Sequence, residues 1–290
     1  MIEIEHIQIA SGSVRLHAVA AGPSEGPLLI LLHGFPEFWY GWRKQIGPLA
    51  QAGFRVIAPD QRGYNLSDKP QGIQTYAMPE LIRDVISVAD SAGRQRFLLA
   101  GHDWGAAVAW AAAALHPDRI ERLAILNVPH PAVFLRYLRT RPRQMIRSWY
   151  MLFFQIPRLP EALISAGNFA LGKRSLLLSS RKGTFTDEDL DRYREAWSRP
   201  GALTAMINWY RALFRSRPRG AGRIAAPTRI IWGEKDRFLL RDLARDSLDY
   251  CDRGELVPLR EATHWVQHEE PERVNQLLIE FFKATRAGIG

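Results

Sequence analysis

An aspartate stands between two glycines in the segment Gly101-His102-Asp103-Trp104-Gly105, after an apolar stretch and before an alanine-rich one. Small flanking residues permit a sharp, strained turn from a strand into a helix, which lifts the central side chain into a pocket. A carboxylate is already ionised at neutral pH and can attack a saturated carbon directly. Although Asp and Gly also occur together in ordinary turns, the spacing predicts Asp103 as a nucleophile for alkyl transfer.

Two later residues supply an acid and a base. Asp236 ends the strand-like segment "RIIWGEKD", and His264 follows the next one in "GELVPLREATH". The chain order of nucleophile, acid and histidine suits a histidine base that a carboxylate orients. The backbone N–H groups of Phe35, in "HGFPE", and of Trp104, at the start of the predicted helix, are placed to receive an oxyanion.

The elements that must position these residues alternate between strands and helices. Segments 2–10 and 13–21 predict an antiparallel hairpin. The following strands are predicted at 27–34, 54–60, 96–101, 122–128, 226–236 and 254–264, and the helices of this part at 40–52, 78–92, 104–116 and 271–284. This rhythm is typical of a mostly parallel sheet that is covered on both faces. The carboxyl ends of its strands form the functional edge, where Asp103, Asp236 and His264 are expected.

The pattern changes at Pro129-His130-Pro131, after which residues 131–218 contain amphipathic helical stretches and no convincing strand. One of these stretches opens with Thr186 and has Asp189 three positions later, a relative of the capping box. We therefore predict a core domain made of residues 1–130 and 219–290, with an all-helical cap inserted at 131–218.

The chain resembles the α/β-hydrolase superfamily and, within it, the epoxide hydrolases, over nearly its whole length. The matching blocks are "HGFPEFWYGWR", "PDQRGYNLSDKP", "GHDWG", "GEKDRF" and "ATHWVQHEEP". The resemblance implies an α/β fold with a mostly parallel, eight-stranded sheet and a helical cap. It also implies that Tyr150, in "SWYMLFFQ", and Tyr210, in "NWYRALF", are the cap tyrosines that polarise an epoxide oxygen.

The activity implied by the resemblance is the conversion of epoxides to vicinal diols. Asp103 would form a covalent hydroxyalkyl ester, which water activated by His264 and Asp236 would hydrolyse. This chemistry needs neither a metal nor an organic cofactor. His264 and His268 have a zinc-like spacing, but there is no H-E-x-x-H motif, so His268 is interpreted as a residue at a helix start.

Three alternatives remain open at this point. Haloalkane dehalogenases share the aspartate elbow, but they often have an Asn halide donor where this chain has Phe35. Fluoroacetate dehalogenases follow the aspartate with arginines, where this chain has Trp104 and Ala107. A non-catalytic ligand-binding protein of the same fold is the third, because a fold alone does not guarantee activity.

Aromatic and methionine residues predict an apolar pocket for a small epoxide, although residues of these types on helices serve equally well in packing. The candidates are Phe38, Trp39, Trp149, Met151, Phe153 and Met206. His33 and His102, which flank the elbow region, are interpreted as hydrogen-bonded supports of loops rather than as bases.

Composition narrows the remaining classes. Apolar residues make up 47% of the 290 residues, which suffices for a large core. The formal net charge is +9, but no nucleic-acid-binding motif accompanies it, so no nucleic-acid partner is predicted. No export signal or membrane-spanning segment is evident, and the single cysteine, Cys251, suits a cytoplasmic location. The oligomeric state, monomer or homodimer, is left open.

Overall fold

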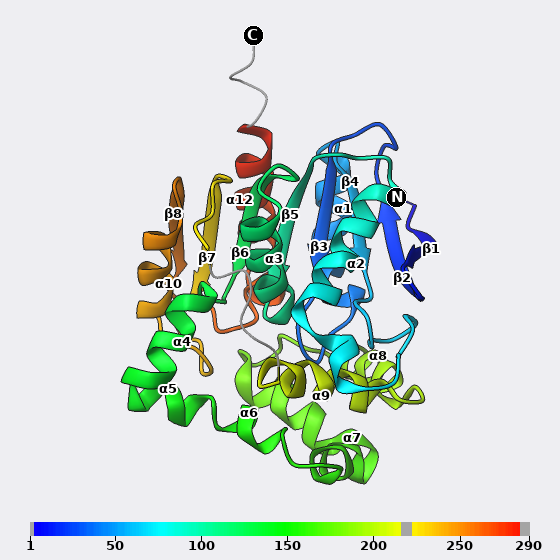
Figure 1. Ribbon diagram of the computed structural model, residues 1–290, viewed down its shortest axis with the longest axis vertical. Helices are drawn as coiled ribbons and strands as arrows, with labels where there is room; N and C mark the ends of the chain where they lie inside the picture. Colours follow the sequence, from blue (N-terminus) through cyan, green and yellow to red (C-terminus); the bar gives the residue numbers. More distant parts are fainter. Residues whose placement is uncertain (1–2, 216–221, 285–290) are drawn as a thin grey trace.

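The computed structural model describes residues 3–215 and 222–284, and within them an eight-stranded sheet crosses the whole molecule (Figure 1). The strand order is β1-β2-β4-β3-β5-β6-β7-β8. β1 and β2 form an antiparallel hairpin and β2 also pairs antiparallel with β4, whereas all pairs from β4 to β8 are parallel. The strands are β1 (Glu5–Ser11), β2 (Val14–Ala21), β3 (Leu28–Leu32), β4 (Arg55–Pro59), β5 (Phe97–His102), β6 (Ile120–Leu126), β7 (Thr228–Gly233) and β8 (Gly254–Leu259). The predicted hairpin and mostly parallel sheet are therefore confirmed.

Helices cover both faces of the sheet because the central strands are apolar on both sides. In β3, Leu28, Ile30 and Leu32 belong to one buried cluster, whereas Leu29 and Leu31 belong to another. This alternation follows from the two-residue period of a strand. The first cluster includes α2 (Met78–Ser91) and α3 (Trp104–Leu115), and the second includes α1 (Arg43–Gln51) and α12 (Pro271–Lys283).

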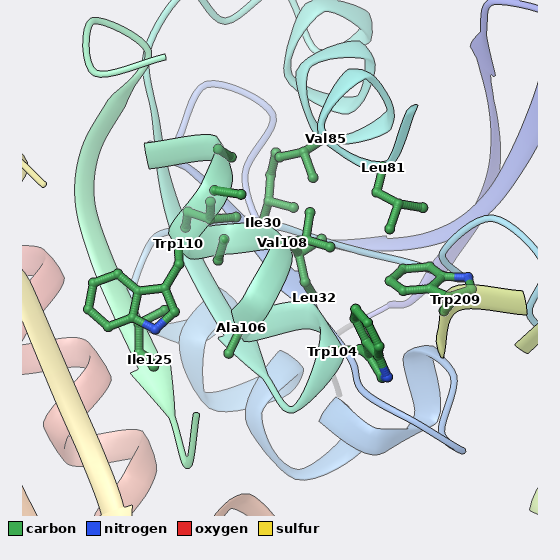
Figure 2. Packing of buried hydrophobic residues seen from close by; sticks show 14 of the residues in the cluster. Ile30, Leu32, Leu81, Val85, Trp104, Ala106, Val108, Trp110, Ile125 and Trp209 are labelled. Carbon is green, nitrogen blue, oxygen red and sulfur yellow. The ribbon is translucent and has the colours of Figure 1, made fainter. Parts of the chain in front are cut away.

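The first cluster packs α2 and α3 against the sheet (Figure 2). Trp110, Ala106 and Val108 of α3 lie beside Ile30 of β3 and Ile125 of β6, and all five are fully buried. Alanines are frequent in α3 because the helix is buried nearly all round, and small side chains let it approach the strands closely. This packing fixes the start of α3, where Asp103 lies.

Six helices and no strand lie between β6 and β7 in the described residues. They are α4 (Pro131–Thr140), α5 (Pro142–Arg147), α6 (Trp149–Phe153), α7 (Leu159–Ser179), α8 (Asp187–Ser198) and α9 (Ala202–Leu213), and together we call them the helical insertion. The insertion gathers at one end of the sheet (Figure 1). Its predicted start at 131 coincides with the start of α4, whereas the predicted boundary at 218/219 lies outside the described residues. The capping box predicted at Thr186 and Asp189 is confirmed at the start of α8.

Short elements complete the chain. They are three 3-10 helices, η1 (Trp39–Trp42), η2 (Ile73–Tyr76) and η3 (Leu248–Tyr250), and the helices α10 (Asp242–Ser247) and α11 (Val266–Glu269). The helix α7 is interrupted by non-helical backbone from Ala166 to Phe169. Over the described residues, no helix has both the length and the apolar character needed to cross a bilayer.

Candidate active site

Asp103 occupies a strained turn between β5 and α3. Its φ of 49° and ψ of −124° lie outside the regions that L-residues favour. The turn is possible because its neighbours lack side chains: a Cβ on Gly101 would lie 2.5 Å from the Gly105 carbonyl oxygen, and a Cβ on Gly105 would lie 2.2 Å from the Leu32 carbonyl oxygen. Packing of α3 against β3 and β5 therefore requires both glycines, and the Asp103 side chain is lifted away from the sheet edge.

His264 lies between two carboxylates. Its Nδ1 is 2.7 Å from Asp236 Oδ2, and its Nε2 is 3.5 Å from Asp103 Oδ2. The side chains of His264 and Asp236 are almost completely buried, whereas that of Asp103 is 19% exposed. The structure thus brings together the three residues that the sequence predicts as nucleophile, acid and base, although they are far apart along the chain.

Asp236 is fixed by donors that approach both of its carboxylate oxygens. The backbone N–H groups of Phe238 and Leu239 donate to Oδ1 at 2.7 and 3.0 Å. The Asn127 side chain donates to Oδ2 at 2.8 Å, and its own oxygen accepts from the Gly233 N–H at 2.9 Å. The sequence analysis gave Asn127 no role. Its place at the end of β6, beside β7, is the signal that could have revealed it.

The Phe35 N–H donates to Asp103 Oδ1 at 2.6 Å. Gly34 allows this approach, because a Cβ at that position would lie 2.2 Å from Asp103 Cβ. Trp104 begins α3, whose amino-terminal N–H groups and dipole favour negative charge at Asp103. The two oxygens of Asp103 are consequently distinct: Oδ1 is held by a backbone donor, whereas Oδ2 faces His264.

Tyr150 of α6 and Tyr210 of α9 approach Asp103 from the helical insertion. Their rings lie 5.9 Å apart between centroids, and Tyr210 also packs edge-on against Trp104 and Phe35. Burial, followed by the charge on Asp103, raises the pKa of both hydroxyls well above the usual tyrosine range. Both phenols therefore stay protonated at neutral pH and can donate hydrogen bonds.

A cavity of about 260 Å³ lies between the sheet edge and the insertion, and the candidate residues Asp103, His264, Tyr150 and Tyr210 all line it. Most of the other lining residues are apolar. Of the six predicted pocket residues, Trp149, Phe153 and Met206 line this cavity. The lining residues that the sequence analysis missed include Phe154, Leu176, Trp197, Leu203, Phe238 and Trp265.

The other three predicted pocket residues do not line the cavity, and those predictions are wrong. Phe38 is buried against Tyr40 and Tyr193, and Trp39 packs against His6 and Phe38. Met151 is buried but is absent from the lining of the cavity. An aromatic or methionine side chain at helical spacing can point either into a cavity or into the core, and the sequence does not show which.

Neighbouring charges and hydrogen bonds shift the pKa values of His264 and Asp103. Burial lowers the pKa of His264, but the charge on Asp236 and the hydrogen bonds with both carboxylates outweigh burial and raise it to about 10. Burial opposes ionisation of Asp103, yet the contacts with His264 and the Phe35 N–H hold its pKa below the ordinary value. The resting site therefore contains an imidazolium between two carboxylates.

A second buried carboxylate, Glu37, lies behind the site. It contacts His268 Nε2 at 2.7 Å and His102 Nδ1 at 3.2 Å, and the Tyr193 hydroxyl of α8 donates to it at 2.7 Å. His102 also bonds the His264 carbonyl oxygen at 2.9 Å, so its predicted role as a hydrogen-bonded support is confirmed. Burial disfavours the Glu37 charge, but His268 and His102 outweigh burial and hold the pKa of Glu37 well below its usual range.

The sequence analysis missed Glu37 because its side-chain partners come from three distant segments, at His102, Tyr193 and His268. The same cluster explains His268, which lies in the short helix α11 and contacts a carboxylate. His33 is likewise a loop support, since it accepts from the Gln61 N–H at 3.0 Å. Within the residues that the structure describes, no group of three or more histidine, cysteine or acidic side chains is arranged to hold a metal ion.

Comparison with known proteins places the chain in a family. The α/β-hydrolase fold family matches residues 27–271. The chain is 47% identical to the AB hydrolase superfamily protein YfhM of Bacillus subtilis, over 95% of this chain and 96% of that protein. It is 40% identical to Epoxide hydrolase 4 of Mus musculus, over 96% of this chain and 79% of that protein.

A solved structure agrees with these relatives. The epoxide hydrolase of Bacillus megaterium, crystallised with an inhibitor, superimposes with a TM-score of 0.87 at 32% identity, covering 96% of this chain and all of that chain. The chain therefore belongs to the α/β-hydrolase superfamily and, within it, to the epoxide hydrolase family.

Proposed function

We propose that this protein hydrolyses apolar epoxides to vicinal diols through a covalent ester on Asp103, with no metal or organic cofactor. The observation that carries the proposal is the placement of two protonated tyrosines, Tyr150 and Tyr210, in the same apolar cavity as the Asp103 carboxylate. An epoxide needs a nucleophile on carbon and a donor on oxygen at the same time. The names of the relatives support the same activity.

In the first half-reaction, Asp103 Oδ2 attacks one epoxide carbon and the bond from that carbon to the ring oxygen breaks. Oδ2 is the attacking atom because the Phe35 N–H already occupies Oδ1. Tyr150 and Tyr210 donate to the oxygen as it gains alkoxide charge, and it takes up a proton through them. Each such donor in a water-poor site typically contributes about 10²–10³ in rate.

In the second half-reaction, neutral His264 takes a proton from water, and the resulting hydroxide attacks the ester carbon of Asp103. The Phe35 and Trp104 N–H groups stabilise the oxyanion that develops on Oδ1. The bond from the ester carbon to Oδ2 then breaks, and the protonated histidine returns the proton to the leaving oxygen. The diol thus leaves with Oδ2, and an oxygen from water replaces it in Asp103.

The charges of the resting site explain why the two half-reactions occur in this order. Because the imidazolium of His264 is stabilised partly by Asp103, ester formation removes one of the two charges that raise its pKa. His264 then releases a proton, which balances the one that the ring oxygen takes up. The histidine becomes a base only after the nucleophile has reacted.

Replacement of His264 by Gln tests the covalent step. The variant keeps Asp103 but cannot activate water, so mixing with styrene oxide should give an intact mass increased by the mass of the epoxide. The double variant Asp103→Asn/His264→Gln is the matched control and should give no adduct. Absence of an adduct in His264→Gln with each of several epoxides would contradict the proposal.

A single turnover in ¹⁸O-labelled water tests the ester route in the unaltered protein. The Asp103 peptide should gain the label and the first diol should lack it. Direct attack of water on the epoxide would instead place the label in the first diol.

A paired assay separates this activity from dehalogenation and from simple binding. With styrene oxide and 1-bromobutane offered separately, we expect diol formation and no halide release. Halide release alone would favour a haloalkane or fluoroacetate dehalogenase, and binding without either product would favour a non-catalytic protein. Phe35 supports the expectation, since its side chain lines the cavity without a donor for a halide.

A cytoplasmic location remains part of the proposal, supported by the single cysteine. Cys251 is buried and free, and burial raises the pKa of its thiol to about 11, so that the thiol stays protonated and unreactive at neutral pH.

A further inference from the structure

The helical insertion exposes an unusual number of large apolar side chains. Of the fourteen that are exposed in the described residues, ten lie between residues 145 and 178, on α5, α6, α7 and the loop between α6 and α7. We define the α5–α7 surface by Met145, Ile146, Trp149, Leu152, Leu163 and Leu171. Ile146 is 71% exposed, Leu152 65% and Trp149 63%. α5, α6 and α7 follow one another along the end of the molecule opposite α12 (Figure 1).

The same part of the chain carries the net charge of the protein. Residues 131–182 contain ten Lys and Arg and a single acidic residue, Glu161, whereas the rest of the chain contains 29 residues of each sign. The formal net charge of +9 is therefore confined to 52 residues that also expose the apolar side chains. A solvated surface of ordinary composition would mix the two signs.

Several of these Lys and Arg side chains form no ion pair within the described residues and can therefore bind an external partner. Arg136 pairs with Asp246, and Lys173 with Asp191. By contrast, no ion pair within the described ranges involves Arg139, Arg143 or Arg174, and all three side chains are exposed. The cationic charge near the α5–α7 surface is thus largely uncompensated.

The α5–α7 surface is continuous with the cavity. Trp149 and Leu171 line the cavity and are also 63% and 50% exposed, and the exposed Ser175 of α7 lines it as well. These residues lie where the cavity meets the outside of the molecule. The exposed apolar side chains of the α5–α7 surface therefore reach the entrance to the candidate active site, and the uncompensated arginines lie in the same part of the chain.

We propose that the α5–α7 surface docks on anionic lipid membranes, lying on the bilayer without crossing it. Tryptophan, leucine and isoleucine enter the boundary between headgroups and acyl chains, while arginines pair with lipid phosphates. Anionic lipids attract basic residues close to the surface. A docked molecule presents its cavity entrance to the apolar phase of the bilayer.

Other occupants fit the observations less well. In a symmetric dimer the α5–α7 surface of one copy would face the same surface of the other copy, which would bring like charges together. A nucleic acid would pair with the arginines but would gain nothing from Ile146 and Leu152. An acidic protein seated here would cover the cavity entrance between Trp149 and Leu171, whereas a bilayer leaves it open to an apolar phase.

Flotation of the full-length chain with lipid vesicles tests the proposal. We expect binding to phosphatidylcholine vesicles that contain about one third phosphatidylglycerol, and little binding to pure phosphatidylcholine. Arg139→Gln/Arg143→Gln should lower the partition coefficient about 25-fold, because each basic residue near an anionic surface contributes about fivefold. Ile146→Glu/Leu152→Glu should lower it at least about tenfold. Salt at about 0.5 M should weaken binding of the unaltered protein.

Matched controls carry the same changes elsewhere. Leu115→Glu replaces another exposed leucine, at the end of α3, and Arg96→Gln/Arg273→Gln removes two exposed arginines outside the insertion. All variants should keep the circular dichroism spectrum and thermal midpoint of the unaltered protein, and the controls should bind vesicles as it does. If the variants of the α5–α7 surface bind vesicles as well as the control variants do, the proposal is overturned. A homodimer that ignores vesicles and that Ile146→Glu/Leu152→Glu dissociates also overturns it.

Discussion

Asp103→Asn removes one negative charge next to His264 while leaving the side chain almost the same size. Asp103 Oδ2 lies 3.5 Å from His264 Nε2, and the His264 side chain is 3% exposed. At this distance two unit charges interact by about 5 kcal/mol for an effective dielectric constant near 20, which corresponds to more than a thousandfold in proton affinity. Even a third of this interaction would lower the proton affinity of His264 more than tenfold. The pKa of His264 should therefore fall clearly below the value of about 10 in the unaltered protein.

The measurement is an NMR titration of the histidine side chains. His130 serves as an internal control, because burial lowers its pKa to about 4 and its hydrogen bond is to the Gly222 carbonyl oxygen, away from the site. Asp236→Asn should also lower the pKa of His264, and more strongly than Asp103→Asn, since Asp236 is the nearer carboxylate at 2.7 Å.

The raised pKa of His264 should also make the free energy of unfolding depend on pH. A histidine whose pKa is raised by folding stabilises the native state fully below its unfolded pKa, near 6.5, and that contribution disappears as the pH rises through about 10. Urea denaturation of the unaltered protein should therefore lose stability between about pH 7 and pH 10 more steeply than Asp103→Asn. An unchanged or higher pKa of His264 in Asp103→Asn would refute the reasoning that ester formation turns the histidine into a base.

Further predictions concern the tyrosines, a glycine and the buried carboxylate. Tyr150→Phe and Tyr210→Phe should each slow ester formation roughly 10²-fold, measured as adduct growth by rapid-quench mass spectrometry in the His264→Gln background. Gly34→Ala should cost about 1–3 kcal/mol in urea denaturation, because its Cβ would lie 2.2 Å from Asp103 Cβ, whereas Gly47→Ala should not, since nothing lies within 4 Å. Glu37→Ala should lower stability by at least about 1–3 kcal/mol in the same assay at neutral pH, because it leaves the buried hydrogen-bonding groups of His102, His268 and Tyr193 without this carboxylate.

The parts of the fold that local sequence controls were predicted well. The apolar run of β3 and the alanine-rich α3 follow from the side-chain period of each element, which does not depend on distant residues. The start of α8 is also determined locally, because the side chains of Thr186 and Asp189 each accept a hydrogen bond from the other residue's backbone N–H.

Residues with a role that depends on distant partners were predicted poorly. Glu37 is held by Tyr193 and His268, which are 156 and 231 positions away along the chain. Phe38 and Phe154 are both buried in the same core cluster, but only Phe154 lines the cavity. No pattern within one segment distinguishes them, because the choice depends on which helix packs opposite.

The sequence by itself determined the strained turn at Asp103 and the elements that carry it, since the glycines around Asp103 and the apolar periods act within a few residues. It also placed Asp236 and His264 at strand ends, and parallel strands bring such ends to one edge. Only the tertiary structure decided how Asn127 holds Asp236, which side chains enclose the cavity, and which exposed side chains lie at its entrance. These features arise from contacts between segments that packing alone brings together, so that their geometry is a property of the folded chain.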